Sequence, residues 1–228
     1  MSLTTFRHHK CRLCKNFLTG VTEYGGEQVD GDPILFESEN FFVLPDLSPV
    51  ASFHLLVVSK EHCHSMATLP HDIIDELDLI IDMLCGKLKE KLGCSLAIFE
   101  HGTLGQSVGT LNSINHFHLH IVQFDGKLSE MVEKNALCEK VGIEELSSLS
   151  KAAVKEYIFV QDNDGKRYVF LFDKENIRSQ LARKLIYDKC LKKQAKQTSA
   201  TYNWKKGIDV LRYNASAEVL KEVFNKKG

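Results

Sequence analysis

The sequence has little net charge, no long apolar segment and no regular set of cysteines. Its 228 residues include 29 Lys and Arg and 30 Asp and Glu, giving a formal net charge of −1. This balance does not favour bulk electrostatic binding to nucleic acid or to an anionic membrane. No apolar run approaches the about 18 residues of a membrane-spanning helix, and residues 1–7 lack the apolar core of a secretory signal. We therefore expect a cytoplasmic protein that binds neither a membrane nor a nucleic acid.

The seven cysteines are scattered, and their odd number does not fit a disulfide framework. Only Cys11 and Cys14 lie close together, in a Cys-x-x-Cys segment. Such a pair can be a redox motif, half of a metal site or two incidental cysteines. With 43% hydrophobic residues the chain can bury a full core, and its length allows one domain or two.

Three histidines alternate with apolar residues in the segment Asn112–Val122. In an extended strand His116, His118 and His120 would share one face, while the apolar residues between them point into a core. Imidazole titrates near neutrality, so three of them can supply a nucleophile, a proton donor and an anion or metal contact. A three-histidine catalytic zinc site is an alternative. In such a site the three imidazole nitrogens must converge on one ion. This is awkward on a straight strand, because its first and third residues lie about 7 Å apart.

The segment His116–Val122 resembles the motif of the histidine triad (HIT) family, in which two apolar residues follow the alternating histidines. Upstream, Phe42–His62 is similar to the family's aspartate strand, its proline-containing turn and a strand that leads to a histidine. The similar region covers residues 11–124. HIT proteins are nucleotide hydrolases and transferases. The resemblance implies such an activity, and it also implies an α+β fold with an antiparallel sheet and flanking helices. Homodimerisation through the long helix and an edge of the sheet is common among relatives.

The resemblance also implies catalytic roles for the triad. His118 would attack the α-phosphorus of a nucleotide conjugate and form a nucleotidyl-histidine, which water or another acceptor then resolves. His120 would contact the phosphate and help to protonate the leaving group, and His116 would hold the geometry. His54, in the upstream strand, fits a structural or a functional role equally.

Several further residues are implied as substrate contacts. Asp46 would accept hydrogen bonds from the ribose hydroxyls, and Ser113 would donate to a phosphoryl oxygen. Phe41 or Leu44 would line the base pocket. Glu100 stands where many family members have an asparagine that contacts ribose or phosphate, so we expect its carboxylate to meet a sugar hydroxyl, a neighbouring histidine or a moiety other than adenosine.

A structural zinc site is a further implication, because some HIT proteins complete a Cys-x-x-Cys pair with two histidines. The corresponding residues are Cys11, Cys14, His62 and His116, a normal tetrahedral Cys2His2 set. This closed site would tie the N-terminal segment to the triad strand and leave no open position for water. The implied mechanism requires no catalytic metal.

About a hundred residues follow the similar region. We therefore expect a HIT-like domain over residues 1–125 and an α/β extension over 126–228 that packs on it. Ser179–Arg183 matches a segment of similar extended HIT proteins, so Gln180 and Arg183 are candidate contacts to phosphate or to groups around it. The expected helices are 70–92, 127–137 and 142–155, the expected strands are 34–38, 40–45, 54–59 and 95–100, a hairpin is expected over 156–160 and 166–172, and a loop over 19–33.

Three functions remain open from the sequence. The first is a hydrolase or nucleotidyltransferase that cleaves a phosphoester, phosphoanhydride or phosphoramidate. The second is a non-catalytic nucleotide-binding or interaction protein that retains the pocket. The third is a zinc-dependent hydrolase that uses the triad, which chelators would inactivate without unfolding it.

Overall fold

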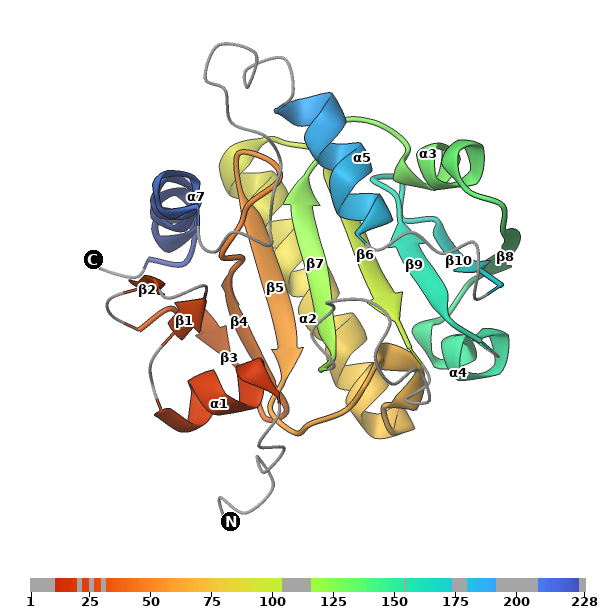
Figure 1. Ribbon diagram of the computed structural model, residues 1–228, viewed down its shortest axis with the longest axis horizontal. Helices are drawn as coiled ribbons and strands as arrows, with labels where there is room; N and C mark the ends of the chain where they lie inside the picture. Colours follow the sequence, from red (N-terminus) through yellow and green to blue (C-terminus); the bar gives the residue numbers. More distant parts are fainter. Residues whose placement is uncertain are drawn as a thin grey trace.

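One continuous eight-stranded sheet forms the centre of the protein (Figure 1). The computed structural model describes residues 11–19, 22–24, 27–29, 32–103, 116–153, 155–173, 180–191 and 209–225. The strand order is β3-β4-β5-β7-β6-β9-β10-β8, and every neighbouring pair is antiparallel. The strands are β3 (Phe36–Glu37), β4 (Phe41–Pro45), β5 (His54–Ser59), β6 (Leu96–Gly102), β7 (His118–Gln123), β8 (Glu139–Ile143), β9 (Tyr157–Gln161) and β10 (Arg167–Leu171).

Helices cover both faces of this sheet, so the expected α+β class is confirmed (Figure 1). One face packs on α2, and the other packs on α1, α3 and α5. None of the helices in the described ranges is long and apolar enough to cross a membrane. The helices are α1 (Arg12–Thr19), α2 (His71–Leu92), α3 (Leu128–Asn135), α4 (Leu149–Ala152), α5 (Leu181–Cys190) and α7 (Val210–Val223), with short 3-10 turns η1 (Met66–Thr68) and η2 (Leu146–Ser148).

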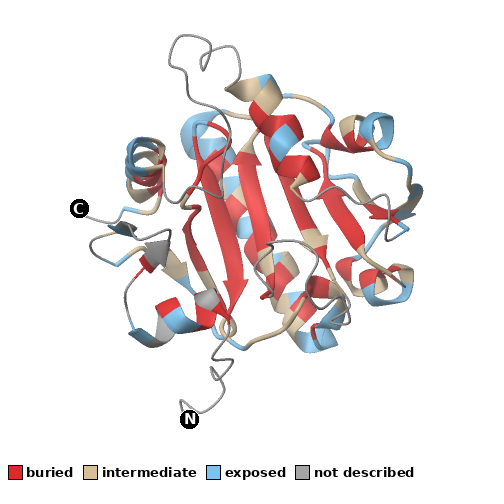
Figure 2. Cartoon of the chain, in the orientation of Figure 1, coloured by how far each residue is buried: buried red, intermediate tan, exposed pale blue. Residues whose placement is uncertain are grey.

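The long helix α2 follows directly from its sequence. Its buried residues recur at helical spacing, from Ile74 to Leu88, and all of them pack in the core on the far side from α5. The helix begins after Pro70 and ends at Gly93, whose φ of 59° is the left-handed conformation that glycine adopts without strain. Figure 2 shows the central strands as the most continuously buried part of the chain.

Two sequence-based expectations differ from the structure. Residues 19–33 were expected to be a loop, but β1 (Thr22–Tyr24) and β2 (Glu27–Val29) form a separate two-stranded hairpin. Residues 142–155 were expected to be one helix. Their first residues instead belong to β8, which pairs with β10, and only the short η2 and α4 are helical. Apolar spacing in a short segment does not reveal such edge pairing.

The C-terminal extension continues the sheet of the HIT-like region. β6 pairs with β7 on one side and with β9 on the other, with Gly102 opposite Tyr157. A Cβ at position 102 would lie 2.0 Å from the Tyr157 ring, so glycine is needed for this close packing. Although the extension adds strands to the same sheet, the boundary between residues 125 and 126 remains a prediction.

Candidate functional site

The triad residues divide between two neighbouring sites. Strand β7 begins at His118, and His116 lies just before it. His118 and His120 lie opposite Val58 and Leu56 of β5, on the face that packs on α1 and α5. His118 and His120 share one face, as the alternating pattern predicts, and His116, just outside the strand, meets the two cysteines that pack on that side of the sheet.

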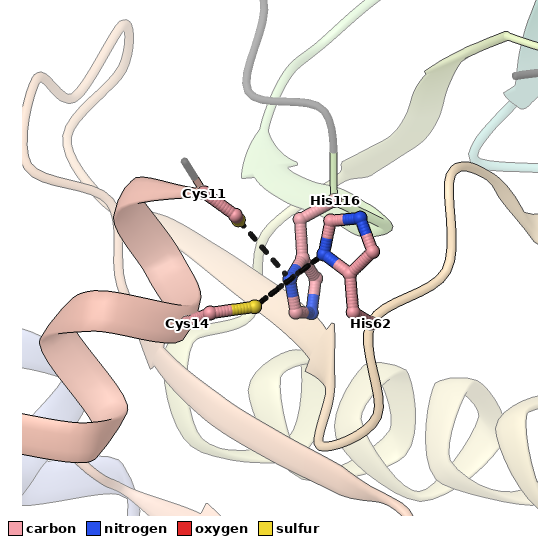
Figure 3. A group of neighbouring side chains, drawn as sticks. All are labelled: Cys11, Cys14, His62 and His116. Atoms are coloured by element: carbon pink, nitrogen blue, oxygen red, sulfur yellow. Dashed lines mark hydrogen bonds between the residues drawn. The ribbon is translucent and has the colours of Figure 1, made fainter. Parts of the chain in front are cut away.

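His116 belongs to a cluster with Cys11, Cys14 and His62 (Figure 3). Its Nδ1 lies 3.5 Å from the Cys11 Sγ, 3.3 Å from the Cys14 Sγ and 3.3 Å from the His62 Nδ1, and the Cys14 Sγ lies 3.4 Å from the His62 Nδ1. The edges of a tetrahedron around zinc are about 3.3 to 3.8 Å for nitrogen and sulfur donors at ordinary bond lengths. The cluster therefore has the spacing and the donor set of a closed tetrahedral metal site.

The second ring nitrogen of His116 sets the tautomer that leaves Nδ1 able to bind a metal. Its Nε2 lies 2.8 Å from the carbonyl oxygen of Ser59, to which it can donate a hydrogen bond while Nδ1 stays unprotonated. Burial lowers the pKa of His116 to about 4, so the ring is neutral at physiological pH and can act as a ligand. With both nitrogens engaged, His116 is a poor candidate for a direct role at the phosphate.

His118 is the half-buried imidazole next to this cluster. Its Nδ1 donates a hydrogen bond to the backbone oxygen of His116, 2.7 Å away. This bond fixes the tautomer, because the proton must lie on Nδ1 and Nε2 keeps its lone pair. Burial is the main cause that lowers the pKa of His118 below its ordinary value, so the ring is neutral near pH 7. A neutral imidazole with an unprotonated Nε2 is the form that acts as a nucleophile.

His120 lies deeper, between an aromatic ring and a second histidine. It stacks on Phe99 with ring centroids 4.4 Å apart and an interplanar angle of 11°. Its Nδ1 lies 2.9 Å from the Nε2 of His54, so one of the two rings donates to the other. Burial lowers the pKa of His54 to about 3 and that of His120 well below its ordinary value. The structure therefore gives His54 a place beside the triad, a role that the sequence left open.

Asp46 is not free to receive a ribose in this structure. The guanidinium of Arg183 binds its two carboxylate oxygens at 2.7 and 3.1 Å, and the backbone N–H of Ser48 donates to Oδ1 at 2.8 Å. His54 and His120 each have a ring nitrogen 3.9 Å from this carboxylate. Burial is the largest single cause and raises the pKa of Asp46, but the charge and hydrogen bonds of Arg183, together with the charges of His54 and His120, outweigh it and hold this pKa well below its usual range.

Through Arg183, the C-terminal extension contributes a side chain that binds Asp46 beside the histidines. Arg183 lies in α5 and also donates to the backbone oxygen of Ser48, 2.6 Å away. Of the two roles expected from the sequence, these contacts to Asp46 and Ser48 fit the one in which Arg183 binds groups around the substrate site, and a direct phosphate contact remains a prediction. Gln180 adopts a left-handed conformation (φ 62°) just before α5, and Ser113 lies outside the described residues.

Glu100 lies on the opposite face of the sheet from His118 and His120. It is 1% exposed, and its carboxylate accepts hydrogen bonds from the backbone of Met66 at 2.7 Å and from the Tyr157 hydroxyl at 2.6 Å. Its neighbour Phe99 faces the histidines instead, because successive residues of a strand point to opposite faces. Glu100 is thus part of the packed core, and we leave it out of the proposed substrate contacts.

The two candidate residues for the base pocket, Phe41 and Leu44, lie on opposite faces of the sheet. Phe41 is fully buried on the α2 side, where its ring meets Phe117 edge to face with centroids 6.0 Å apart. Leu44 lies on the histidine side and packs against the two cysteines of α1. Of the two, only Leu44 is on the face that could border a substrate.

A neutral side chain at position 100 is expected to change how stability depends on pH. Burial raises the pKa of Glu100 from 4.5 to about 7, so the folded protein binds this proton more tightly than the unfolded chain. The stabilisation of the folded state by protonated Glu100 is fully present below about pH 4.5 and is lost as the pH rises to about 7 and above. Glu100→Gln should remove this loss, which amounts to about 3 kcal/mol at about 1.4 kcal/mol per pKa unit.

Urea unfolding of both proteins at pH 5 and pH 8 checks this expectation. The free energy of unfolding of Glu100→Gln, relative to the wild type, should increase from the lower to the higher pH. Asp72→Asn, at an exposed position in the first turn of α2, is the control. A constant difference between Glu100→Gln and the wild type at both pH values would contradict the account.

Comparisons with known proteins agree with the triad and its surroundings. Residues 25–135 match the family model described as "Scavenger mRNA decapping enzyme C-term binding". An uncharacterized HIT-like protein of Chlamydia muridarum is 32% identical over 97 residues, which are 41% of this chain and 71% of that protein. Its counterpart in Chlamydia trachomatis is 31% identical over 97 residues, 41% of this chain and 80% of that protein.

Among solved structures, a HIT family hydrolase from Clostridium thermocellum is similar over 51% of this chain and 92% of that chain, with 20% identity and a TM-score of 0.36. This structural likeness is too weak to carry an argument of its own. The sequence relatives are sufficient, since each is above 30% identity over most of its own length. The chain belongs to the histidine triad (HIT) family.

Proposed function

We propose that this protein is a nucleotide hydrolase or nucleotidyltransferase that acts at the α-phosphate of a nucleotide conjugate. The observation that carries the proposal is the hydrogen bond from the His118 Nδ1 to the His116 oxygen, which leaves Nε2 of a half-buried imidazole unprotonated. Family membership and the match to a decapping-enzyme family model support a nucleotide as the substrate class.

The proposed reaction has two displacements at phosphorus. First, the His118 Nε2 forms a bond to the α-phosphorus while the bond from phosphorus to the leaving group breaks. Water or another acceptor then forms a bond to phosphorus, the bond to His118 breaks, and the nucleotide is released. His120, adjacent to His118 with ring centroids 5.0 Å apart, would contact the phosphate. The expected donation from Ser113 to a phosphoryl oxygen remains part of the proposal.

The arrangement around His120 supports an orienting role for Asp46. If the His120 Nδ1 donates to the His54 Nε2, the His54 Nδ1–H points toward Asp46, 3.9 Å away. The opposite tautomer would direct a buried lone pair at a carboxylate, which is electrostatically unfavourable. We therefore assign Asp46 to the orientation of the two imidazoles, much as a buried aspartate orients a catalytic histidine.

The experiment that tests the function measures product release from a panel of substrates by chromatography. The panel contains dinucleoside polyphosphates, nucleoside phosphoramidates, nucleotide sugars and capped dinucleotides. Release of a nucleoside monophosphate, with transient mass addition of one nucleotidyl group to the protein, is expected. If no substrate turns over but nucleotides raise the melting temperature, the alternative function of a non-catalytic nucleotide-binding protein is correct.

We further propose that the Cys11, Cys14, His62 and His116 cluster holds a structural zinc ion. Four protein donors fill a tetrahedral site, so bound zinc would contribute stability and would not activate water. The ion would connect α1 to the segment before β7, and thereby support the His116 carbonyl that orients His118.

Removal of one ligand is expected to remove the metal. Purified wild-type protein should contain about one zinc ion per chain by elemental analysis, and Cys14→Ser much less, because serine is a poor zinc ligand. Chelator should lower the melting temperature of the wild type but not that of Cys14→Ser. Cys94→Ser, which changes a half-buried cysteine outside the cluster, should retain both the metal and the chelator response. Equal zinc content in all three proteins would contradict the assignment.

A further inference from the structure

His101 lies on the same face of the sheet as the proposed nucleophile, and no function has been assigned to it so far. In the β6–β7 pair, Phe99 lies opposite His120, and its ring stacks on His120. His101 is two residues further along β6 and therefore on the same face. The pairing of β6 with β7 ends at Phe99 and His120, so His101 lies just beyond the paired residues, on the side of the sheet that carries His118. The proximity is also electrostatic, since His101 contributes to the lowered pKa of His118 after burial, its main cause.

A carboxylate from the C-terminal extension orients His101. The His101 Nε2 lies 3.1 Å from Oε1 of Glu156, which directly precedes β9. Hydrogen bonding to a carboxylate places a proton on Nε2 and leaves Nδ1 to accept or deliver the second proton. Glu156 therefore serves as a positioning residue for His101.

Access to solvent distinguishes His101 from the first and third triad histidines. The side chains of His101 and Glu156 are each 18% exposed, whereas the side chain of His120 is 5% exposed. His116 has both nitrogens engaged, toward the cysteines and toward Ser59. His101 is thus an imidazole on the His118 face that can exchange a proton with water and has a carboxylate partner.

Resting on the proposed function, we propose that His101, oriented by Glu156, is the acid–base residue of the reaction. As the His118 Nε2 bonds to phosphorus, the protonated His101 gives its proton to the departing oxygen or nitrogen, and the bond from phosphorus to that atom breaks. Neutral His101 then takes a proton from the attacking water, whose oxygen bonds to phosphorus as the bond to His118 breaks. This assigns to His101 the proton transfer that the sequence resemblance gives to His120.

The test compares two substrates with the same nucleoside 5′-phosphoryl group and different leaving groups. One releases an alkyl amine or alcohol, which needs a proton, and the other releases p-nitrophenolate, which departs as a stable anion. His101→Asn should lower kcat/KM for the first substrate by about 10²- to 10⁴-fold and leave the second nearly unchanged. Glu156→Gln, which retains the imidazole, should show the same pattern with a smaller loss. His71→Asn, at an exposed position at the start of α2, is the control and should not affect either substrate.

The outcomes separate this inference from the proposed function. Equal losses for both substrates in both variants would show a structural role only and overturn the inference, as would no loss with either substrate. Wild-type turnover of both substrates would still support the proposed function in those cases. Failure of the wild type to release either leaving group would overturn the proposed function and the inference together. If His101→Asn does not fold, the two substrates are compared in Glu156→Gln.

Discussion

His118→Asn is expected to lower kcat for the best substrate by about four orders of magnitude or more, as removal of a nucleophile does in other covalent mechanisms. The substitution is selective. The asparagine amide can still donate to the His116 oxygen that now accepts from the His118 Nδ1 at 2.7 Å, but the position of Nε2 becomes empty. The protein should therefore fold normally and lose only the atom that attacks phosphorus.

Chromatography of the released nucleotide measures this effect, with intact-mass analysis after rapid acid quenching as a second observable. The nucleotidyl adduct should form in the wild type and be absent from His118→Asn. His71→Asn serves again as the histidine control on the surface. Undiminished turnover in a folded His118→Asn variant would exclude His118 as the nucleophile and would also remove the basis for the role of His101.

Arg183→Met is expected to destabilise the protein by about 3 to 5 kcal/mol at pH 7, because it leaves the carboxylate of Asp46 buried without its cation. The side chains of Arg183 and Asp46 are 8% and 7% exposed, so water cannot replace the lost hydrogen bonds without opening the site. In the wild type, the lowered pKa of Asp46 contributes stability above about pH 4 that is lost as the pH falls further. In the variant, burial favours protonation of Asp46, so its deficit relative to the wild type should shrink as the pH falls.

Urea unfolding at pH 7 and pH 5 measures both the deficit and its pH dependence. Arg167→Met is a matched control, since Arg167 also binds an aspartate, Asp78, with two nitrogens and also joins the extension to the HIT-like region. The Asp78 side chain is 33% exposed, so this loss should be about 1 kcal/mol or less. Adding Asp46→Asn to Arg183→Met should restore part of the stability, because no unpaired charge remains. Equal deficits for Arg183→Met and Arg167→Met would contradict the account.

The elements with strong periodic signals could be predicted from the sequence. Helix α2 has a long apolar repeat with clear start and stop residues, the triad strand alternates, and the β9–β10 hairpin consists of two apolar runs joined by a polar turn. The grouping of Cys11 and Cys14 with His62 and His116 followed from the family resemblance, and the structure brings these four residues together. Whether they hold zinc remains a prediction.

The remaining errors have two physical causes. A shift of one residue along a strand reverses the face, so Glu100 lies in the core while His101, its neighbour, lies on the face that carries His118. Local sequence patterns also do not predict contacts between segments that are far apart in the sequence. The Asp46–Arg183 ion pair joins residues 137 positions apart, and it converts an expected ribose contact into part of a buried charge network.

The segment recognised by the family model is shorter than the sheet. Its match ends at residue 135, the last residue of α3, before the strand that pairs with the outer side of β6 and before the arginine that binds Asp46. The region similar to the family therefore ends before the sheet is complete. A fragment cut where the similarity stops would keep every triad histidine yet expose an unpaired strand edge, the kind of surface on which proteins aggregate. We therefore expect a stable protein to require the longer chain, because it covers that edge with β9 and supplies Arg183 to Asp46.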